Sequence, residues 1–195
     1  MAPKTKRPEI PLPDQMKNLP LVEGGYRKPW FVKGEDFRVT DGEKAWLSVS
    51  KKACWICGNP FIEPTYAMVG DAMSATIRIY TEPPCHIECA EYAMQVCPFI
   101  LYPNAKRRTA GLQAEDLLEN QKKNAAVKVG SENPGEFYIT LVSNFVYHHD
   151  EQVMAFNKED ILALQHWVGG VRQQSIPDPI LRPEQVPEAS RSRIG

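Results

Sequence analysis

The sequence has no long apolar run and no motif of a secreted protein. No stretch approaches the roughly 18 consecutive apolar residues that a membrane-spanning helix needs, so we expect no membrane segment. The first residues, MAPKTKRPEIPLP, are basic, but no apolar stretch follows them, and this pattern is not that of a secretory signal. We therefore predict a cytoplasmic protein, in a bacterium or in a phage-infected host cell.

The sequence also lacks an excess of positive or negative charge, and it lacks the common catalytic motifs. The net charge is −1, so bulk charge attracts neither nucleic acid nor an anionic membrane. There is no glycine-rich phosphate loop, which argues against a nucleotide-hydrolysing motor, and no GxSxG elbow of the serine hydrolases. Function must therefore be sought in local groups of residues.

Prolines divide the chain into a folded part and two tails. The chain has 195 residues, of which 43% are apolar, enough for one domain with a core. Its 17 prolines cluster towards the ends. Proline-rich segments with little to bury remain extended. We predict disordered tails at 1–20 and 176–195, and a single domain at 21–175.

Five cysteines are present, and their spacing is typical of metal ligands rather than of disulfides. In the run CWICG, the two residues between Cys54 and Cys57 allow a tight turn to direct both sulfurs at one ion. Gly58 permits the backbone conformation that such a turn needs. This segment predicts a zinc knuckle.

The second half of the predicted zinc site begins with His86 and Cys89, whose HxxC spacing places them on one face of a helix. Cys85 is the alternative to His86. Cys97 follows Cys89 by eight residues, roughly 12 Å along a helix, too far to share one ion. Four protein ligands leave no open position for water, so we expect a structural Zn²⁺.

The remaining pattern predicts an α+β fold. A knuckle, a β hairpin and a ligand-bearing helix, in that order, form a treble-clef-like zinc site, to which a second hairpin and a C-terminal helix are added. Pro98 ends the ligand helix, and Asn157 with Asp160 caps the last one. Helices are predicted at 43–52, 85–97, 112–123 and 158–168, and strands at 65–70, 75–80, 137–149 and 151–156.

The chain resembles a family of uncharacterised bacterial and phage proteins. Members have a GYPxPWF-like segment, a DFR segment, a CWxCG knuckle, the motif EPPxHxxCAxYAxxxCPF, a basic tract and a later NPG segment. The family's histidine matches His86, which favours that ligand, whereas Arg27 and Lys28 depart from a more apolar pair. The resemblance implies relatives and no activity. The matching segments here are 25–31, 36–38, 54–58, 82–99, 106–108 and 133–135.

Three functions compete on these residues. The first is a zinc-stabilised binding module, which recognises a protein through its proline-rich tails or a nucleic acid through the basic run Lys106, Arg107 and Arg108. The second is a metal-dependent hydrolase or nuclease, and the third is a redox switch that uses Cys85 and Cys97. The hydrolase would use His148, His149 and Asp150, although a hairpin turn is the simpler interpretation of that trio.

Overall fold

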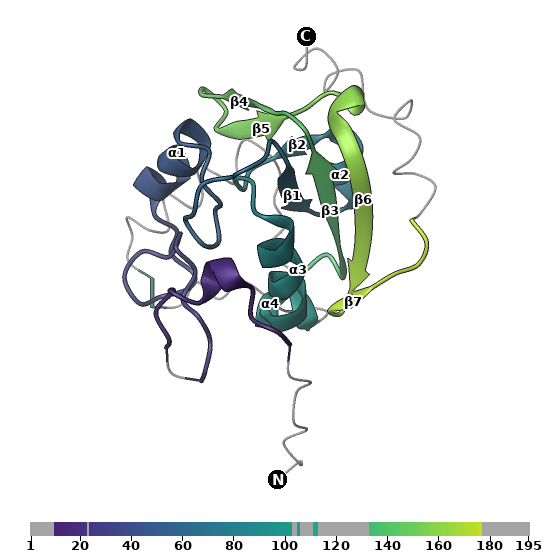
Figure 1. Cartoon of the computed structure of the whole chain (residues 1–195). Coiled ribbons are helices and arrows are strands. Elements are labelled where there is room, and N and C mark those ends of the chain that lie inside the picture. Colours follow the sequence, from purple (N-terminus) through teal and green to yellow (C-terminus); the bar gives the residue numbers. More distant parts are fainter. Residues whose placement is uncertain (1–9, 23, 103–104, 106–110, 113–132, 177–195) are drawn as a thin grey trace.

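The computed structural model describes residues 10–22, 24–102, 105, 111–112 and 133–176 and has the predicted α+β class (Figure 1). Its helices include the single 3-10 turns η1 (Asp14–Met16) and η2 (Lys158–Asp160). The α-helices are α1 (Gly42–Ser50), α2 (Ala72–Ile77), α3 (Ile87–Val96) and α4 (Pro98–Leu101). The strands are β1 (Tyr66–Gly70), β2 (Ile79–Tyr80), β3 (Glu136–Val142), β4 (Val146–His148), β5 (Val153–Ala155), β6 (Ile161–Val168) and β7 (Val171–Arg172).

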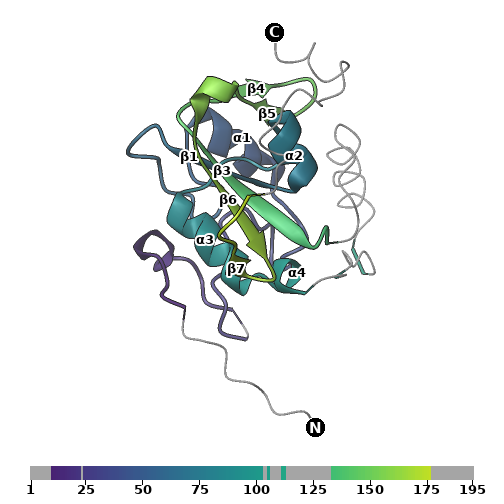
Figure 2. The same cartoon turned by 90° about the vertical axis from the view of Figure 1, so that its right-hand side faces the viewer.

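The larger sheet is antiparallel, with the strand order β1-β3-β6-β7. Figure 2 shows β3 and β6 side by side, and their register pairs Tyr138 with His166 and Ile139 with Gln165. Successive side chains of a strand point to opposite faces. Ala67 of β1 and Ile139 of β3 consequently pack with α3, in the cluster that also holds the predicted metal ligands.

The opposite face of this sheet packs against the smaller antiparallel sheet, whose order is β2-β5-β4. Tyr66 and Met68 of β1 share a buried cluster with Met154 and Phe156. The hydroxyl groups of Tyr80 and Thr140 form a buried hydrogen bond of 2.8 Å between the two sheets.

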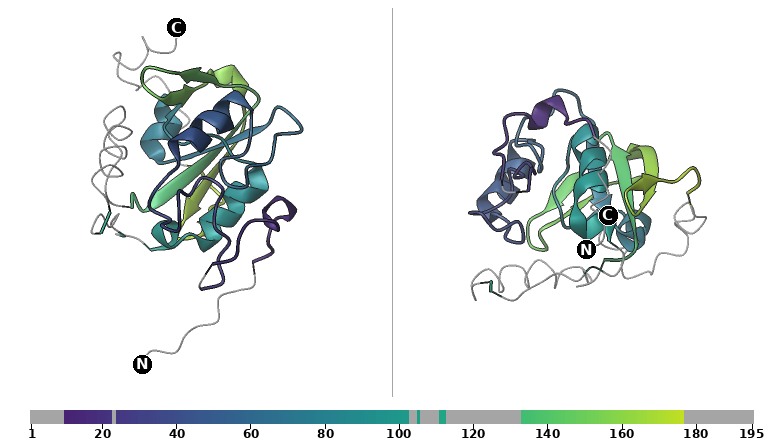
Figure 3. Two further views of the ribbon diagram at one scale, coloured as in Figure 1. Left: turned by 90° about the vertical axis from the view of Figure 1, so that its left-hand side faces the viewer. Right: turned by 90° about the horizontal axis from the view of Figure 1, so that it is seen from below.

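The N-terminal segment and α1 cover the remaining side of α3, which lies between them and the larger sheet (Figure 3, right). The side chain of Asp41 caps α1 by accepting hydrogen bonds from the backbone N–H groups of Glu43 and Lys44. Met16 and Leu19 are buried in the cluster around the knuckle. The predicted disordered tail is therefore wrong for residues 10–20, because two spaced apolar side chains are sufficient to anchor a proline-rich segment. Residues 1–9 and 177–195 lie outside the described residues.

The predicted hairpin at 65–80 is wrong. Its first strand is present as β1, but β1 pairs with β3 from much later in the chain. The side chain of Asp71 accepts a hydrogen bond from the N–H of Ser74 and so begins α2, where the second strand was expected. Only Ile79 and Tyr80 remain extended, as β2, which pairs with β5. The order is therefore knuckle, β1, α2, β2 and ligand helix.

The predicted C-terminal helix at 158–168 is also wrong. The capping box of Asn157 and Asp160 is present, but it begins only the single turn η2. From Ile161 the chain is a strand, because β3 offers a full antiparallel partner and Trp167 becomes buried against the core. The predicted helix at 112–123 falls almost entirely outside the described residues.

The other predicted elements are confirmed in outline. α1 and α3 lie where helices were expected, and β4 and β5 form the second hairpin. The run at 137–149 is two strands rather than one, since β3 and β4 belong to different sheets. Within the described part of the chain, no helix has the length and apolar character needed to cross a membrane.

Candidate metal centre

The knuckle is a tight turn that the backbone holds closed. The N–H of Cys54 donates to the carbonyl of Asn59 at 2.8 Å, and the N–H of Gly58 donates to the carbonyl of Cys54 at 2.8 Å. Gly58 has φ +77°, a conformation that glycine adopts readily. A Cβ atom at this position would also lie 2.7 Å from Cγ of Trp30. Both features explain why glycine follows the second cysteine.

The segment that leads into α3 is fixed against β1 and against the knuckle. Cys85 and Ala67 exchange two backbone hydrogen bonds of 2.9 Å each, which form an isolated antiparallel bridge. The N–H of Trp55 in the knuckle donates to the carbonyl of Pro84 at 2.9 Å. His86 then occupies the N-cap position of α3, so that Cys89 lies on the first turn of the helix.

These contacts bring the four predicted ligands together. The sulfurs of Cys54, Cys57 and Cys89 and one ring nitrogen of His86 all lie within 4.8 Å of one another. Tetrahedral zinc with Zn–S near 2.3 Å and Zn–N near 2.0 Å requires ligand separations of about 3.5–3.8 Å. The distance from Cys57 Sγ to His86 Nδ1 is 3.3 Å, and the three cysteines are buried. This donor set fits zinc.

Hydrogen bonds favour a thiolate at Cys54. Its sulfur accepts from the backbone N–H of Cys57 at 3.5 Å and from that of His86 at 3.3 Å. Burial alone would raise the pKa of Cys54, but hydrogen bonds from Cys57, from the other nearby thiols and from the His86 ring hold this pKa far below its ordinary value. Hydrogen bonds to Cys54 and Cys57 raise the pKa of His86 to about 10 and also raise that of Cys89. A thiolate is the form of cysteine that binds metal.

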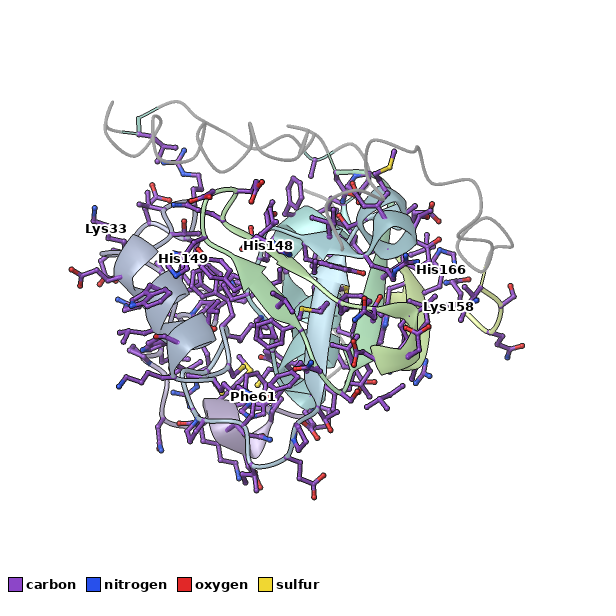
Figure 4. All side chains as sticks on the ribbon, turned by 90° about the horizontal axis from the view of Figure 1, so that it is seen from above. Lys33, Phe61, His148, His149, Lys158 and His166 are labelled. Carbon is purple, nitrogen blue, oxygen red and sulfur yellow. The ribbon has the colours of Figure 1, made fainter. Side chains whose placement is uncertain are left out.

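The contacts of the two ring nitrogens of His86 indicate which of them would face a bound metal. Nε2 lies 3.3 Å from the carbonyl oxygen of Pro60, to which a protonated Nε2 donates, while Nδ1 faces Cys57. Metal-bound histidines commonly donate their other ring N–H to such an acceptor. The ring of Phe61 lies 4.8 Å from the imidazole, and Figure 4 shows sulfur atoms close to Phe61. No sequence pattern points to these two supporting groups, because their position depends on how the chain returns after the knuckle.

Neither of the other two cysteines is among the four converging ligands, although the Cys85 thiol is hydrogen-bonded to Cys54, and this contact together with burial raises the pKa of Cys85. The thiol of Cys85, the alternative to His86, is buried and lies 3.9 Å from the carbonyl oxygen of Pro83. Cys97 is the C-cap of α3. A helix of this length separates the two cysteines by about 15 Å, whereas a disulfide needs Cα atoms within about 7 Å. A switch by direct Cys85–Cys97 bonding would therefore require α3 to unfold.

The predicted hydrolase residues do not converge on a second centre. His148 ends β4, and His149 and Asp150 follow in an exposed turn, as the hairpin interpretation predicted. In the part of the chain that is described, the knuckle cluster is the only group of three or more histidine, cysteine or acidic residues placed for a metal. The basic run Lys106, Arg107 and Arg108 lies outside the described residues.

Comparison with known protein families, with curated proteins and with solved structures gave no match to this chain.

Proposed function

We propose that this protein is a zinc-stabilised binding module, in which one structural zinc ion is held by Cys54, Cys57, His86 and Cys89. The observation that carries the proposal is the convergence of these four ligand atoms to within 4.8 Å, from two segments far apart in the sequence. Four protein ligands complete a tetrahedron and leave no position for a reacting water, so the ion supports the fold rather than catalysis.

The zinc would join the knuckle to helix α3, two parts of the molecule that no common strand or helix connects. On one side lies the knuckle, against which Met16, Trp30 and Phe31 pack. On the other side lies α3, whose Met94 packs towards the larger sheet. In small zinc domains the free energy of metal binding, about 10–16 kcal/mol, becomes free energy of folding. The same linkage would hold the N-terminal segment and α1 in place here.

Metal analysis of the purified full-length chain tests the zinc site. We expect about one zinc per chain, removed together with most of the thermal stability by a strong chelator. Cys54→Ser should lose the metal, because it removes a buried ligand sulfur. Cys97→Ser is the matched control and should keep it, because Cys97 lies at the opposite end of α3. Absence of stoichiometric zinc from the wild-type protein, or its retention in Cys54→Ser, would refute the site.

The second part of the proposal is that this scaffold binds a protein partner in a reducing compartment such as the cytoplasm. Its support is the set of free thiols that the site requires, together with the proline-rich ends of the chain. Affinity capture from cells with the zinc-loaded chain tests it, using the zinc-free Cys54→Ser variant for comparison. A protein captured only by the zinc-loaded form supports the proposal. Capture of nucleic acid instead, with an affinity that falls steeply as the salt concentration rises, would show that the partner is a nucleic acid and not a protein.

A further inference from the structure

Three aromatic rings meet on the surface where α1 faces the β4–β5 hairpin. We call Trp46, Tyr147 and His149 the aromatic triad. Trp46 is 47% exposed, and His149 lies in the exposed turn after β4. The His149 ring centre lies 4.7 Å from that of Trp46 and 4.9 Å from that of Tyr147, which are themselves 6.3 Å apart. Figure 4 shows His149 between α1 and the hairpin. The imidazole therefore contacts both larger rings.

Acidic residues flank the aromatic triad along the chain. Glu43 lies one turn before Trp46 on the same side of α1, and the two residues line one surface hollow with Leu47. Asp150 and Glu151 follow His149 directly, and both are exposed. Lys44 is the nearest cation on α1, but its ammonium group lies over the ring of Trp30, 5.8 Å from the ring centre, and donates to the carbonyl of Val32. Glu43, Asp150 and Glu151 therefore give the aromatic triad three acidic neighbours along the chain.

A crevice behind Tyr147 connects the aromatic triad with the knuckle. Tyr147, Gln152, Glu82 and Trp55 are among the residues that line it. The carboxylate of Glu82 accepts a hydrogen bond of 3.1 Å from the indole N–H of Trp55, the residue that follows Cys54. One more acidic group thus lies near the aromatic triad, and the zinc knuckle fixes its position.

We propose that the aromatic triad binds a cationic side chain, an arginine or a lysine, of a protein partner, and that His149 fills this position in the free protein. A cation at the present imidazole centre would lie 4.7 Å and 4.9 Å from the two ring centres, within the roughly 6 Å range of a cation–π contact. Glu43, Asp150 and Glu151 supply the complementary charge. This inference rests on the proposed function as a binding module and names the chemistry of its partner.

The test uses the zinc-loaded full chain and two short peptides, acetyl-Gly-Arg-Gly-amide and the same peptide with citrulline. Citrulline has nearly the shape of arginine but no charge. We expect the arginine peptide to shift the indole N–H resonance of Trp46 with a dissociation constant in about the millimolar range, and the citrulline peptide to leave it unchanged. Equal shifts with both peptides, or none with either, would overturn the proposal.

Variants separate the aromatic triad from the rest of the surface. Trp46→Ala should abolish binding of the arginine peptide, followed by the backbone amide resonances of the β4–β5 turn because the indole is gone, and Glu43→Gln should weaken it. His149→Ala should strengthen binding by about two- to fivefold, because the competing ring is gone. Phe37→Ala is the matched control, since Phe37 is another aromatic side chain with 43% exposure, and binding should not change. Weaker binding in His149→Ala would contradict the proposed displacement.

Zinc content distinguishes this inference from the proposed function. If the wild-type chain holds zinc and captures a protein but Trp46 does not respond to the arginine peptide, the aromatic triad is not the cation site and the binding module stands. If the wild-type chain holds no zinc, the proposed function fails whatever the peptide does. Trp46→Ala should retain its zinc, which shows that lost binding is not lost folding.

Discussion

Among single residues, Gly58 is constrained in two ways at once. Its φ of +77° disfavours any other residue, and the space where a side chain would begin is occupied by the ring of Trp30. We expect Gly58→Ala to lower the free energy of unfolding by about 1–3 kcal/mol and to weaken zinc binding, because the turn that directs Cys54 and Cys57 must open. Urea unfolding and competition with a zinc chelator would measure the two effects.

Gly25 provides the matched control for Gly58. It has a similar φ of +80°, but a Cβ atom there would meet no atom within 4 Å. Gly25→Ala should therefore cost only the backbone strain, about 1 kcal/mol, and leave zinc affinity unchanged. Equal losses of stability and zinc affinity in the two variants would show that the close approach of Trp30 is not the reason why the knuckle requires glycine at position 58.

At the level of elements, α2 depends on its first residue. The helix spans only Ala72–Ile77, too short to be stable alone, and the carboxylate of Asp71 accepts a 2.7 Å hydrogen bond from the N–H of Ser74. We expect Asp71→Ala to destabilise the protein by about 1 kcal/mol, measured by urea unfolding. Asp14→Ala is the comparison, because Asp14 forms only an exposed ion pair with Lys17 and should change little. If the two variants lose a similar free energy of unfolding, the Asp71 cap does not stabilise α2 specifically, and packing must hold the helix in place.

The same elements show what the sequence can and cannot predict. Asn157 and Asp160 form the predicted capping box, yet the helix stops after one turn. A cap fixes where a helix can begin, and β3, which lies before it in the chain, decides that Ile161 onwards is extended. The run at 75–80 was misassigned for the converse reason, since its alternating pattern suits a strand but no neighbouring strand pairs with it until Ile79.

The candidate site was more predictable than the fold around it. The knuckle and the HxxC pair are local patterns, and local spacing was enough to name Cys54, Cys57 and Cys89 and to leave His86 with Cys85 as its alternative, and the structure brings together the ligand atoms of the set that contains His86. The contacts that support the site come from residues whose approach depends on the complete fold, such as the carbonyl of Pro60 on His86. The aromatic triad was missed for the same reason, because Trp46 and His149 come from separate elements and no sequence motif joins them.

For the whole molecule, buried tyrosines at the interface between the two sheets contribute to the response of stability to alkaline pH. Tyr80, from the smaller sheet, is fully buried and bonded to Thr140 of the larger one. Burial raises the pKa of its phenol well above the ordinary value, and the nearby charge of Asp71 adds to the shift. Burial also raises the pKa of Tyr138 on β3. These protons stay in place in the folded protein at a pH where the unfolded chain has lost them.

Below pH of about 10 the tyrosines are protonated in both states, so their contribution to stability is fully present. Above this pH the unfolded phenols ionise first, and the free energy of unfolding should fall by up to about 1.4 kcal/mol per pH unit for each tyrosine, until the folded pKa is reached. Tyr80→Phe removes one of these protons and should make the decline between pH 10 and 12 shallower. It should also cost about 1 kcal/mol at pH 8, because Thr140 loses its partner. Urea unfolding at a series of pH values measures both effects. An equally steep decline in Tyr80→Phe would show that the Tyr80 phenol does not contribute to the loss of stability at alkaline pH.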